Sequence, residues 1–322
     1  MTCLTSIEIC AGGGGQALGL EQAGFNHLAL VELDHYACIT LKANRPSWNV
    51  LEMDLKNFSA KDYQGIDLLA GGVPCPPFSI AGKQLGKDDE RNLFPEVIRI
   101  INECQPNAAM IENVRGLLKP TFDDYRSFIT KEIEVLNYSC SWKLLQASDF
   151  GVSQNRARTV LVAIKKDFAK YFSWPSITKS HTPSVGEALY NEMARYGWKN
   201  VDAWKDKANN IAPTIVGGSK KHGGPDLGPT RARNAWANLG VDGCLIATEP
   251  PSEDFIGMPY LTVKMAAILQ GFPVEWEFAG RKTPAYRQVG NAFPPPVAKA
   301  VGMAIAKAIK DKKKEDAERG VA

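Results

Sequence analysis

The sequence has few histidines and cysteines, and they form no pattern typical of a metal site. Its four histidines do not cluster, and its seven cysteines contain no C-x-x-C pair. An odd number of scattered cysteines also argues against a disulfide framework and favours a reducing compartment. We therefore expect neither a metal centre nor a disulfide-stabilised secreted fold.

Segments that would direct the chain to a membrane are also missing. There is no apolar run of membrane-spanning length, and residues 1–4 lack the basic start of a signal peptide. We predict a soluble, cytoplasmic protein with no membrane partner. The net charge of +3 permits a polyanionic partner without requiring one. Hydrophobic residues make up 44% of the 322 residues, which argues against wholesale disorder.

Apolar segments of strand and helix character alternate over the first half of the chain. This alternation favours an α/β fold with a doubly wound, largely parallel sheet. Strands are predicted at 4–10, 28–31, 48–53, 66–70, 107–111, 139–147 and 159–165, and helices at 92–104 and 123–136.

The pattern breaks down near Trp174. From there to about Pro259 prolines, glycines and tryptophans increase, so we expect a second, smaller and irregular domain. Helices are predicted after it, at 262–270 and 297–309. The charge-rich end, 310–322, is expected to fray.

Ligand-type residues follow three successive strands. The glycine run 11–15 lies between a strand and a helix, where backbone can approach a ligand closely. Glu32 ends the second strand about 20 residues later, where an acidic residue binds ribose hydroxyls, and Asp54 after the third strand could hold an adenine edge. Each alone is also consistent with a tight turn, a helix cap or a solvated charge. Together they indicate a nucleoside-bearing cofactor, either NAD or S-adenosylmethionine.

Cys75 lies on a loop that restrains it. Two glycines end the strand 66–70, and prolines stiffen the backbone on both sides of the cysteine. A free cysteine is more often a small buried apolar residue. This setting, at the carboxyl end of a strand, instead favours a reactive side chain. The polar segment 80–90 is predicted to be a mobile loop that covers the site.

Charged residues follow two later strands. Glu112 directly follows a buried apolar strand, where a carboxylate is costly unless it is paired or used, although a capping or ion-paired role is the alternative. Arg156 and Arg158 alternate on an extended segment, so both guanidiniums are expected on one face, suited to a phosphate or a base edge. An ordinary solvated basic edge is the other interpretation.

One stretch of the irregular region combines small residues with cations. Residues 212–224 are glycine-rich and contain Lys220 and Lys221, and Arg231 and Arg233 follow shortly after. Small residues allow close backbone approach, and interleaved cations suit phosphates and base edges. A solvated glycine-rich loop is the alternative. We predict that these four cations contact nucleic acid.

With the segments described above taken together, the chain resembles the DNA (cytosine-5) methyltransferases over nearly its whole length. Each motif alone is weak, but their joint order and spacing are specific. The matching segments are 11–15, Glu32, Asp54, 72–75, 91–94, 112–114, Gln154-x-Arg156-x-Arg158, 269–273 and 288–292. The compact length is similar to that of bacterial restriction–modification enzymes.

The resemblance implies a large catalytic and cofactor domain at 1–173 plus 284–322. It implies a small target-recognition domain at 174–283 and a DNA cleft between the two. S-adenosylmethionine is the implied cofactor, S-adenosylhomocysteine the product, and double-stranded DNA the substrate, whose target cytosine is flipped out of the duplex. A monomer without an obligate protein partner is implied, located in the bacterial cytosol and associated with the nucleoid when bound to DNA.

The resemblance also implies roles for single residues. Cys75 would add to carbon 6 of the cytosine and so activate carbon 5, and Glu112 would bind ring nitrogen 3 and the exocyclic amine. Arg158, with Arg156 beside it, would hold the carbonyl oxygen and a nearby phosphate. The implied cofactor residues are Cys10, Ala11, Gly12, Gly14, Gly15, Glu32, Leu33, Asp54, Leu55, Pro74, Leu93 and Asn291. The implied DNA contacts are Ser79, Lys83, Gln84, Thr214, Ile215, Lys220, Lys221, Arg231 and Arg233.

Four positions depart from the pattern of many relatives. Cys10 and Leu33 stand where aromatic residues are common, Glu8 where Asp is usual, and Pro76 where Gln is common. Loss of an aromatic contact could reshape cofactor binding. No departure removes a group that the chemistry needs.

Three other functions stay open at this point. A subfamily with this fold methylates tRNA, and the length of region 174–259 is what favours duplex DNA instead. A catalytically inactive DNA-binding relative is disfavoured because Cys75 and Glu112 are both present. An NAD-dependent oxidoreductase fits the glycine loop and Glu32, but it gives no role to Cys75, Glu112 and the arginines together.

Overall fold

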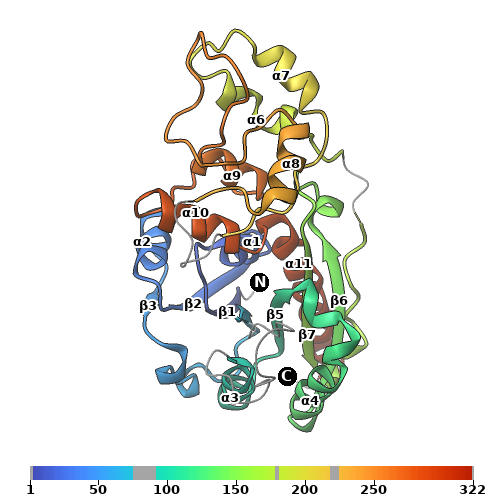
Figure 1. Cartoon of the computed structure of the whole chain (residues 1–322). Helices are drawn as coiled ribbons and strands as arrows, with labels where there is room; N and C mark the ends of the chain where they lie inside the picture. The colour runs from blue at the N-terminus through green and yellow to red at the C-terminus, as the bar shows by residue number, and fades with distance from the viewer. Residues whose placement is uncertain (1–2, 75–91, 178–180, 218–224, 321–322) are drawn as a thin grey trace.

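The computed structural model describes residues 3–74, 92–177, 181–217 and 225–320. Figure 1 shows a sheet flanked by helices and, beyond one end of its strands, a second region of short helices and long connections. Two helices, α9 (Val263–Leu269) and α10 (Lys282–Asn291), lie between that region and the sheet.

The described strands form one seven-stranded sheet in the order β3-β2-β1-β4-β5-β7-β6. The strands are β1 (Leu4–Ile9), β2 (Phe25–Glu32), β3 (Val50–Glu52), β4 (Leu68–Gly72), β5 (Ala108–Val114), β6 (Tyr138–Gln146) and β7 (Ala157–Lys165). The first five pair in parallel, whereas β7 runs antiparallel to both β5 and β6. Residues 147–156 join β6 to β7 and contain only one short helical turn, so the two strands pair antiparallel without a crossover helix. The predicted doubly wound, largely parallel sheet is confirmed.

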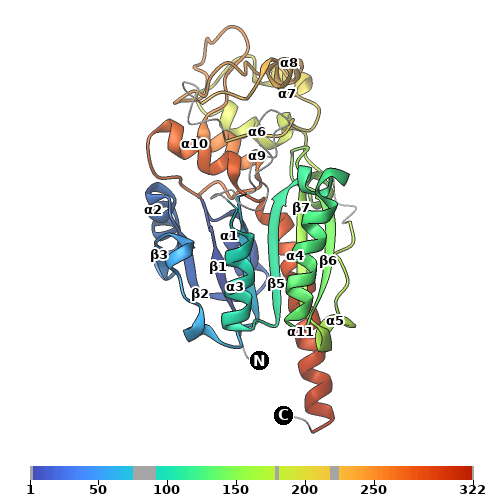
Figure 2. The ribbon, with the colours of Figure 1, turned by 60° about the horizontal axis from the view of Figure 1, so that its bottom comes forward.

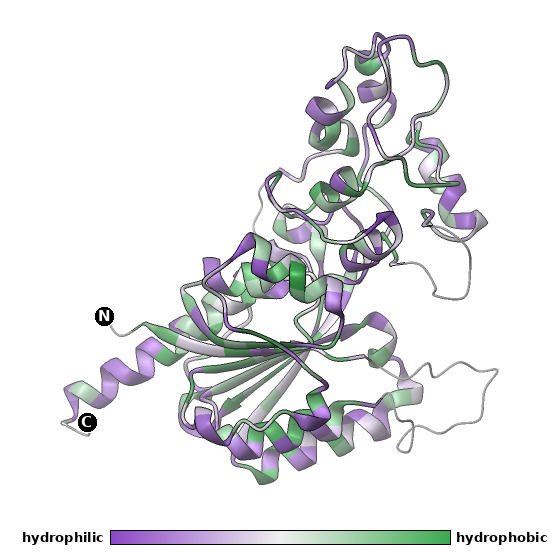
Figure 3. Ribbon diagram, turned by 90° about the vertical axis from the view of Figure 1, so that its left-hand side faces the viewer, coloured by the Kyte–Doolittle hydropathy of each residue, from purple (hydrophilic) through white to green (hydrophobic). Residues whose placement is uncertain are grey.

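The remaining helices cover both faces of the sheet or build the second region. They are α1 (Gly15–Gln22), α2 (His35–Asn44), α3 (Phe94–Cys104), α4 (Asp123–Val135), α5 (Lys166–Ala169), α6 (Val185–Met193), α7 (Val201–Lys207), α8 (Thr230–Asn238) and α11 (Pro295–Glu318). Figure 3 shows the sheet nearly edge-on between two helical layers, with α11 running toward the C-terminus on one side.

Alternation along the strands explains the two layers. Ile7, Ile9 and Ile111 point to one face and pack in one core with apolar residues of α3 and α4. Leu68 and Met110 point to the other face and pack with α1 and α11. Since the core lies on both faces of the sheet, the strand ends are left as the place for ligands.

Glycine permits the close approach of α1 to α11. A Cβ atom at Gly19 would lie 2.4 Å from the carbonyl oxygen of Pro295, which is far inside contact distance. The two helices therefore pack backbone to backbone, and the last helix of the chain lies against the first strand–helix unit.

The second region is more regular than its sequence indicates. The helices α6, α7 and α8 lie within the stretch expected to be irregular, so that expectation is wrong in part. They have seven to nine residues each, too short to give a long periodic signal. At α6 a capping box between Ser184 and Glu187 fixes the helix start. At α9 the side chain of Thr262 caps the helix start by accepting from the amide of Met265.

The last helix is longer than predicted. It continues to Glu318 instead of ending at Ile309, and Figure 2 shows its final turns projecting beyond the sheet. Ion pairs at a spacing of four residues, such as Lys307 with Asp311 and Arg319 with Glu315, support this extension. The charged residues at this end, from which we predicted fraying, are instead spaced so that they pair along a helix.

Candidate active site

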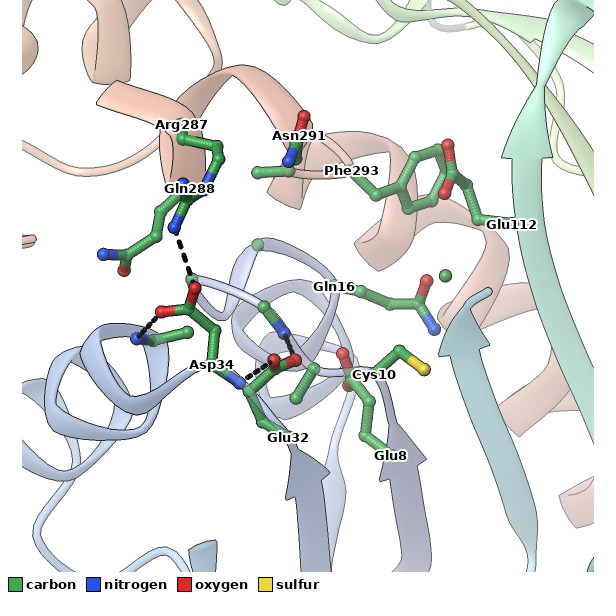
Figure 4. A pocket seen from close by; sticks show the side chains of 17 residues that line it. Glu8, Cys10, Gln16, Glu32, Asp34, Glu112, Arg287, Gln288, Asn291 and Phe293 are labelled. Carbon is green, nitrogen blue, oxygen red and sulfur yellow. Dashed lines mark hydrogen bonds and ion pairs between the residues drawn. The ribbon is translucent and has the colours of Figure 1, made fainter. Parts of the chain in front are cut away.

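A cavity of about 220 Å³ lies at the carboxyl ends of the parallel strands. Its walls come from the ends of β1, β2, β4 and β5 and from α10. The strand order reverses between β1 and β4, and such a switch point is where open α/β sheets bind ligands. Figure 4 shows the labelled side chains of this cavity converging from these elements.

Half of the residues expected at a cofactor line this cavity. They are Cys10, Ala11, Gly12, Gly15, Glu32 and Asn291. The others do not line it: Gly14, Leu33, Asp54, Leu55, Pro74 and Leu93. Asp54 instead caps a short helical turn by accepting from the amide of Lys56 at 2.9 Å, and Leu33 is 67% exposed.

The glycine loop turns sharply into the cavity. Gly12 and Gly14 have φ angles of +54° and +87°, which glycine adopts without strain. Cys10, at the end of β1, has a φ of +51°, an uncommon conformation for a residue with a side chain. A Cβ atom at Gly13 would lie 2.9 Å from the Phe278 ring. The loop backbone therefore forms part of the cavity wall itself.

Glu32 braces this loop. Its carboxylate accepts from the amides of Gly12 at 2.7 Å, Leu33 at 2.9 Å and Asp34 at 2.7 Å. A carboxylate has about four acceptor sites, so one remains for a ligand hydroxyl. Asp34 in turn pairs with Arg287 of α10 at 2.9 Å, which ties the β2 side of the cavity to α10.

Glu112 and Arg158 form an ion pair of 2.9 Å at the other end of the cavity. Glu112 lies opposite Val160 in the β5–β7 ladder, and Arg158 is two residues from Val160, so both side chains emerge on one face. Burial raises the pKa of Glu112, and the charges of Arg158 and Arg156 oppose this rise. A buried carboxyl beside a fixed guanidinium is suited to exchange a proton with a ligand.

Arg156 faces elsewhere, contrary to the expectation that both guanidiniums serve a phosphate or base edge. It is fully buried and donates to the carbonyls of Ile215 at 2.7 Å, Gly290 at 2.8 Å and Ala292 at 2.9 Å. Burial lowers its pKa to about 9. Because no surface of Arg156 is open to a phosphate, its observed contacts are those of a positioning residue.

The chain approaches Cys75 next to Glu112. The Nδ2 of Asn113 donates to the Val73 carbonyl at 3.1 Å, and a Cβ atom at Gly72 would lie 3.0 Å from Oε2 of Glu112. Cys75 itself lies outside the described residues, as do five of the expected DNA contacts: Ser79, Lys83, Gln84, Lys220 and Lys221.

The described residues expected to contact DNA lie in two places. Ile215 is fully buried, and its amide donates to Oε1 of Gln154 at 3.0 Å, so its side chain is not free to touch DNA. Thr214 beside it is hydrogen-bonded to the carbonyl of Asn155. Arg231 is exposed in the first turn of α8, and Arg233, two residues later, donates to the Thr230 hydroxyl at 3.4 Å.

Several cavity residues were not among the expected ligand contacts. They are Glu8, Gly13, Gln16, Asp34, Ala37, Gly72, Arg287, Gln288, Ala292 and Phe293. Most of them neighbour an expected motif in sequence, so motif boundaries widened by two residues would have found them. Glu8 and Gln16 differ, because they are polar, almost fully buried and short of hydrogen-bond partners within the described structure.

The described residues contain no group of three or more His, Cys, Asp or Glu side chains placed to hold a metal ion. No helix of the described chain is long and apolar enough to cross a membrane.

Comparison with known proteins connects this geometry to a family. The model of the C-5 cytosine-specific DNA methylases matches residues 4–307. The chain is 53% identical to the type II methyltransferase M.NgoMIV of Neisseria gonorrhoeae, over 95% of this chain and 98% of that protein. It is also 53% identical to M.NaeI of Lentzea aerocolonigenes, over 96% of this chain and 76% of that protein.

Solved structures share the fold at low sequence identity. A DNMT2 variant of Spodoptera frugiperda has a TM-score of 0.64 at 18% identity, covering 94% of this chain and 99% of its own. The methyltransferase EhMeth of Entamoeba histolytica has a TM-score of 0.66 at 15% identity, covering 97% and 99%. The chain therefore belongs to the C-5 cytosine-specific DNA methylase family and is a DNA (cytosine-5) methyltransferase.

Proposed function

We propose that this enzyme methylates carbon 5 of one cytosine within a specific double-stranded DNA sequence, with S-adenosylmethionine as the methyl donor. The observation that supports this most strongly is the Glu112–Arg158 ion pair of 2.9 Å. It lies beside the segment at Val73 that leads to Cys75. Glu112 lines the same cavity as the glycine loop, so a base and a cofactor can meet there.

The cavity fits a nucleoside cofactor with an amino-acid end. Glu32 keeps one acceptor site for a ribose hydroxyl, and the loop at Gly12 and Gly15 presents backbone to the ligand. Buried polar atoms of Glu8 and Gln16 without partners in the described structure mark a place where a polar ligand group is needed. S-adenosylmethionine, when bound, would supply an electrophilic methyl group on a sulfonium.

Five expected contacts with the cofactor stay predictions, those of Leu33, Asp54, Leu55, Pro74 and Leu93. Leu33 and Pro74 are exposed and Leu93 is half-buried, so these three can meet a ligand larger than the cavity. Gly14 would act through the turn that it permits.

The chain's own residues account for the activation of the base. The thiolate of Cys75 would add to carbon 6 of cytosine, which breaks the ring's conjugation and makes carbon 5 nucleophilic. Glu112, with its pKa raised by burial, would donate its proton to ring nitrogen 3 as negative charge develops there. Arg158 holds Glu112 in place and would bind the carbonyl oxygen of the base.

The end of the reaction reverses the first step. Once carbon 5 carries the methyl group, its proton leaves to a base and the electron pair re-forms the ring double bond. The carbon 6–sulfur bond breaks at the same time, which restores the Cys75 thiolate, and Glu112 recovers its proton from nitrogen 3. Because carbons 5 and 6 are stacked inside a duplex, the cytosine must first be flipped out, at a cost of a few kcal/mol.

We further propose two functional domains. Residues 1–173 plus 284–322 would form the catalytic domain, and residues 174–283 would read DNA. The packing of α11 in the core with α1 and β4 supports the first assignment. The exposure of Arg231 near the start of α8 supports the second. One chain then supplies both parts, in keeping with a monomer without an obligate protein partner.

The biological role that we propose is modification within a type II restriction–modification system. It is supported by the names of the relatives M.NgoMIV and M.NaeI and by their 53% identity over most of the chain. Such an enzyme would act in the bacterial cytosol, where it meets chromosomal DNA.

Bisulfite sequencing of DNA from cells that express the enzyme tests activity and identifies the site. We expect one short sequence methylated at a single cytosine. The matched variant Glu112→Gln keeps size and most contacts, and should lower kcat by about 10²–10⁴-fold because it cannot give a proton to nitrogen 3. Single-turnover methylation of the identified site would measure this loss.

A trapping experiment separates binding from chemistry. On DNA carrying 5-fluorocytosine at the identified site the wild type should form an adduct that survives a denaturing gel, because the fluorine blocks the final elimination. Cys75→Ser should bind this DNA without forming the adduct. An adduct formed equally by Cys75→Ser would contradict the role of Cys75, and unmethylated DNA from wild-type cells would contradict the proposed function as a whole.

A further inference from the structure

Gln16 is a buried glutamine whose amide lacks partners. It is the second residue of α1, is 4% exposed and lines the cavity. Within the described structure neither Oε1 nor Nε2 has a hydrogen-bond partner. Figure 4 shows its side chain extending from the glycine loop toward the side of the cavity where Glu112 and Cys10 lie.

The other buried glutamines of the described residues behave differently. Gln154, Gln270 and Gln288 each use both amide atoms in hydrogen bonds. An unpaired buried amide group destabilises the folded state, so a leucine would fold at least as well at position 16. A ligand that pairs with Gln16 would explain why a polar side chain stands there.

The surroundings indicate the chemistry of that ligand. In α1, which the structure describes in full, the first turn contains no acidic residue and the cap is Gly14, so the positive end of the helix is open to a carboxylate. Glu8 approaches from β1, buried and with Oε2 unpaired in the described structure, as an acceptor suited to an ammonium. A group that carries both charges, an α-amino acid, matches this pair of features.

The residues at the two ends of the cavity also place the amino-acid group of the ligand next to Gln16. Glu32 marks the adenosine end through its remaining acceptor site, and Glu112 marks the end where the base would lie. The reacting methyl must face the base, so the sulfonium lies between these two carboxylates. The amino-acid branch leaves from the same sulfur atom, on the part of the wall to which Gln16 belongs.

We propose that Gln16 binds the amino-acid end of S-adenosylmethionine, with Nε2 donating to the carboxylate and Oε1 accepting from the ammonium. Gln16 then distinguishes the intact cofactor from adenosine derivatives that lack the amino acid. This inference rests on the proposed function, since it requires the cavity to be the cofactor site.

Calorimetric titration with two ligands tests it. S-adenosylhomocysteine carries the amino-acid end, and 5′-methylthioadenosine has the same nucleoside and sulfur without it. We expect Gln16→Leu to weaken binding of S-adenosylhomocysteine by about 10- to 100-fold and to leave 5′-methylthioadenosine unchanged, because hydrogen bonds to charged groups are worth about 1.5–3 kcal/mol. Gln64→Leu, the same change at an exposed position outside the cavity wall, should alter neither.

The outcomes separate this inference from the proposed function. If the wild type binds S-adenosylhomocysteine but Gln16→Leu binds it equally well, or loses both ligands to the same extent, the role of Gln16 is wrong and the function stands. If the wild type binds neither ligand, the cofactor site itself is wrong, and this inference falls with it. A melting temperature of Gln16→Leu no lower than that of the wild type shows that the variant is folded.

Discussion

Buried polar groups are treated differently in two neighbouring regions of this enzyme. One is the cavity wall, defined here by Glu8 and Gln16. The other is the joint, defined by Gln154, Arg156 and Gln270, where the start of β7 meets α10 and the segment at Ile215. At the cavity wall, Oε2 of Glu8 and both amide atoms of Gln16 are unpaired within the described structure. At the joint nearly all are paired, with only Nε of Arg156 left over.

The difference shows which polar groups serve the fold and which serve a ligand. In the joint, Gln154 bonds to Gln270 and to the amide of Ile215, and Gln270 bonds to the carbonyls of Val289 and Ala292. The bond between Gln154 and Gln270 joins residues 116 positions apart in the sequence, and the bond to Ile215 spans 61. Such a network stabilises only when it is complete. At the cavity wall the hydrogen bonding of Glu8 and Gln16 is incomplete, and a bound cofactor would complete it.

Removal of Arg156 should have the largest effect on stability. Arg156→Met keeps the length of the side chain but removes the donor to three buried carbonyls, one of which, Ala292, is also bonded by Gln270. We expect a loss of about 3–5 kcal/mol in the free energy of unfolding. Denaturant unfolding measures it. The control Arg231→Met changes an exposed arginine and should stay within about 0.5 kcal/mol. Equal stability of the two variants would refute the distinction between joint and surface.

Removal of one glutamine from the joint should have a smaller effect. Gln154→Leu deletes the bonds to Leu269, Gln270 and Ile215, and should cost about 1–3 kcal/mol in the free energy of unfolding. The same substitution at Gln16 should cost nothing, because its amide has no described partner to lose. Thermal melting of the two variants side by side checks the comparison. If Gln16→Leu is the less stable of the two, the cavity wall is part of the structural framework after all.

The sequence predicted the sheet because its signals are local. Apolar strands alternate with amphipathic helices, and the glycine run, Glu32 and Glu112 each stand at or near a strand end. The pairing of Glu112 with Arg158 could have been predicted, since both residues belong to expected motifs. Its geometry needed the ladder register, which sets Glu112 opposite Val160.

Other features could not be predicted from local patterns. Arg156 and Arg158 have the same spacing as two residues on one strand face, yet Arg156 precedes β7 and turns toward Ile215 and α10. Only the tertiary fold brings those carbonyls to it. Gln16 was missed for a related reason, because the lack of a partner is a property of its surroundings. The short helices α6 to α8 were missed because seven to nine residues give a weak periodic signal.

The smallest effect, and one of opposite sign, is expected at Glu8. Burial raises the pKa of its carboxyl well above the ordinary value, helped by the charge of Glu32, although a hydrogen bond from the Ala17 amide lowers it. The native state therefore holds a proton that the unfolded chain releases above a pKa of about 4.3. Where the native state binds more protons than the unfolded one, the free energy of unfolding falls as the pH rises, up to the native pKa.

Glu8→Gln keeps a neutral side chain of the same shape, but it has no proton to bind, so its stability does not fall with rising pH on this account. We expect the variant to melt a few degrees above the wild type at pH 8, and the gap to narrow as the pH falls toward 4.3. Melting curves between pH 5 and pH 8 measure the trend. A variant that melts below the wild type at pH 8 would show that Glu8 is ionised and paired in the free enzyme, and the cavity wall would then be as complete as the joint.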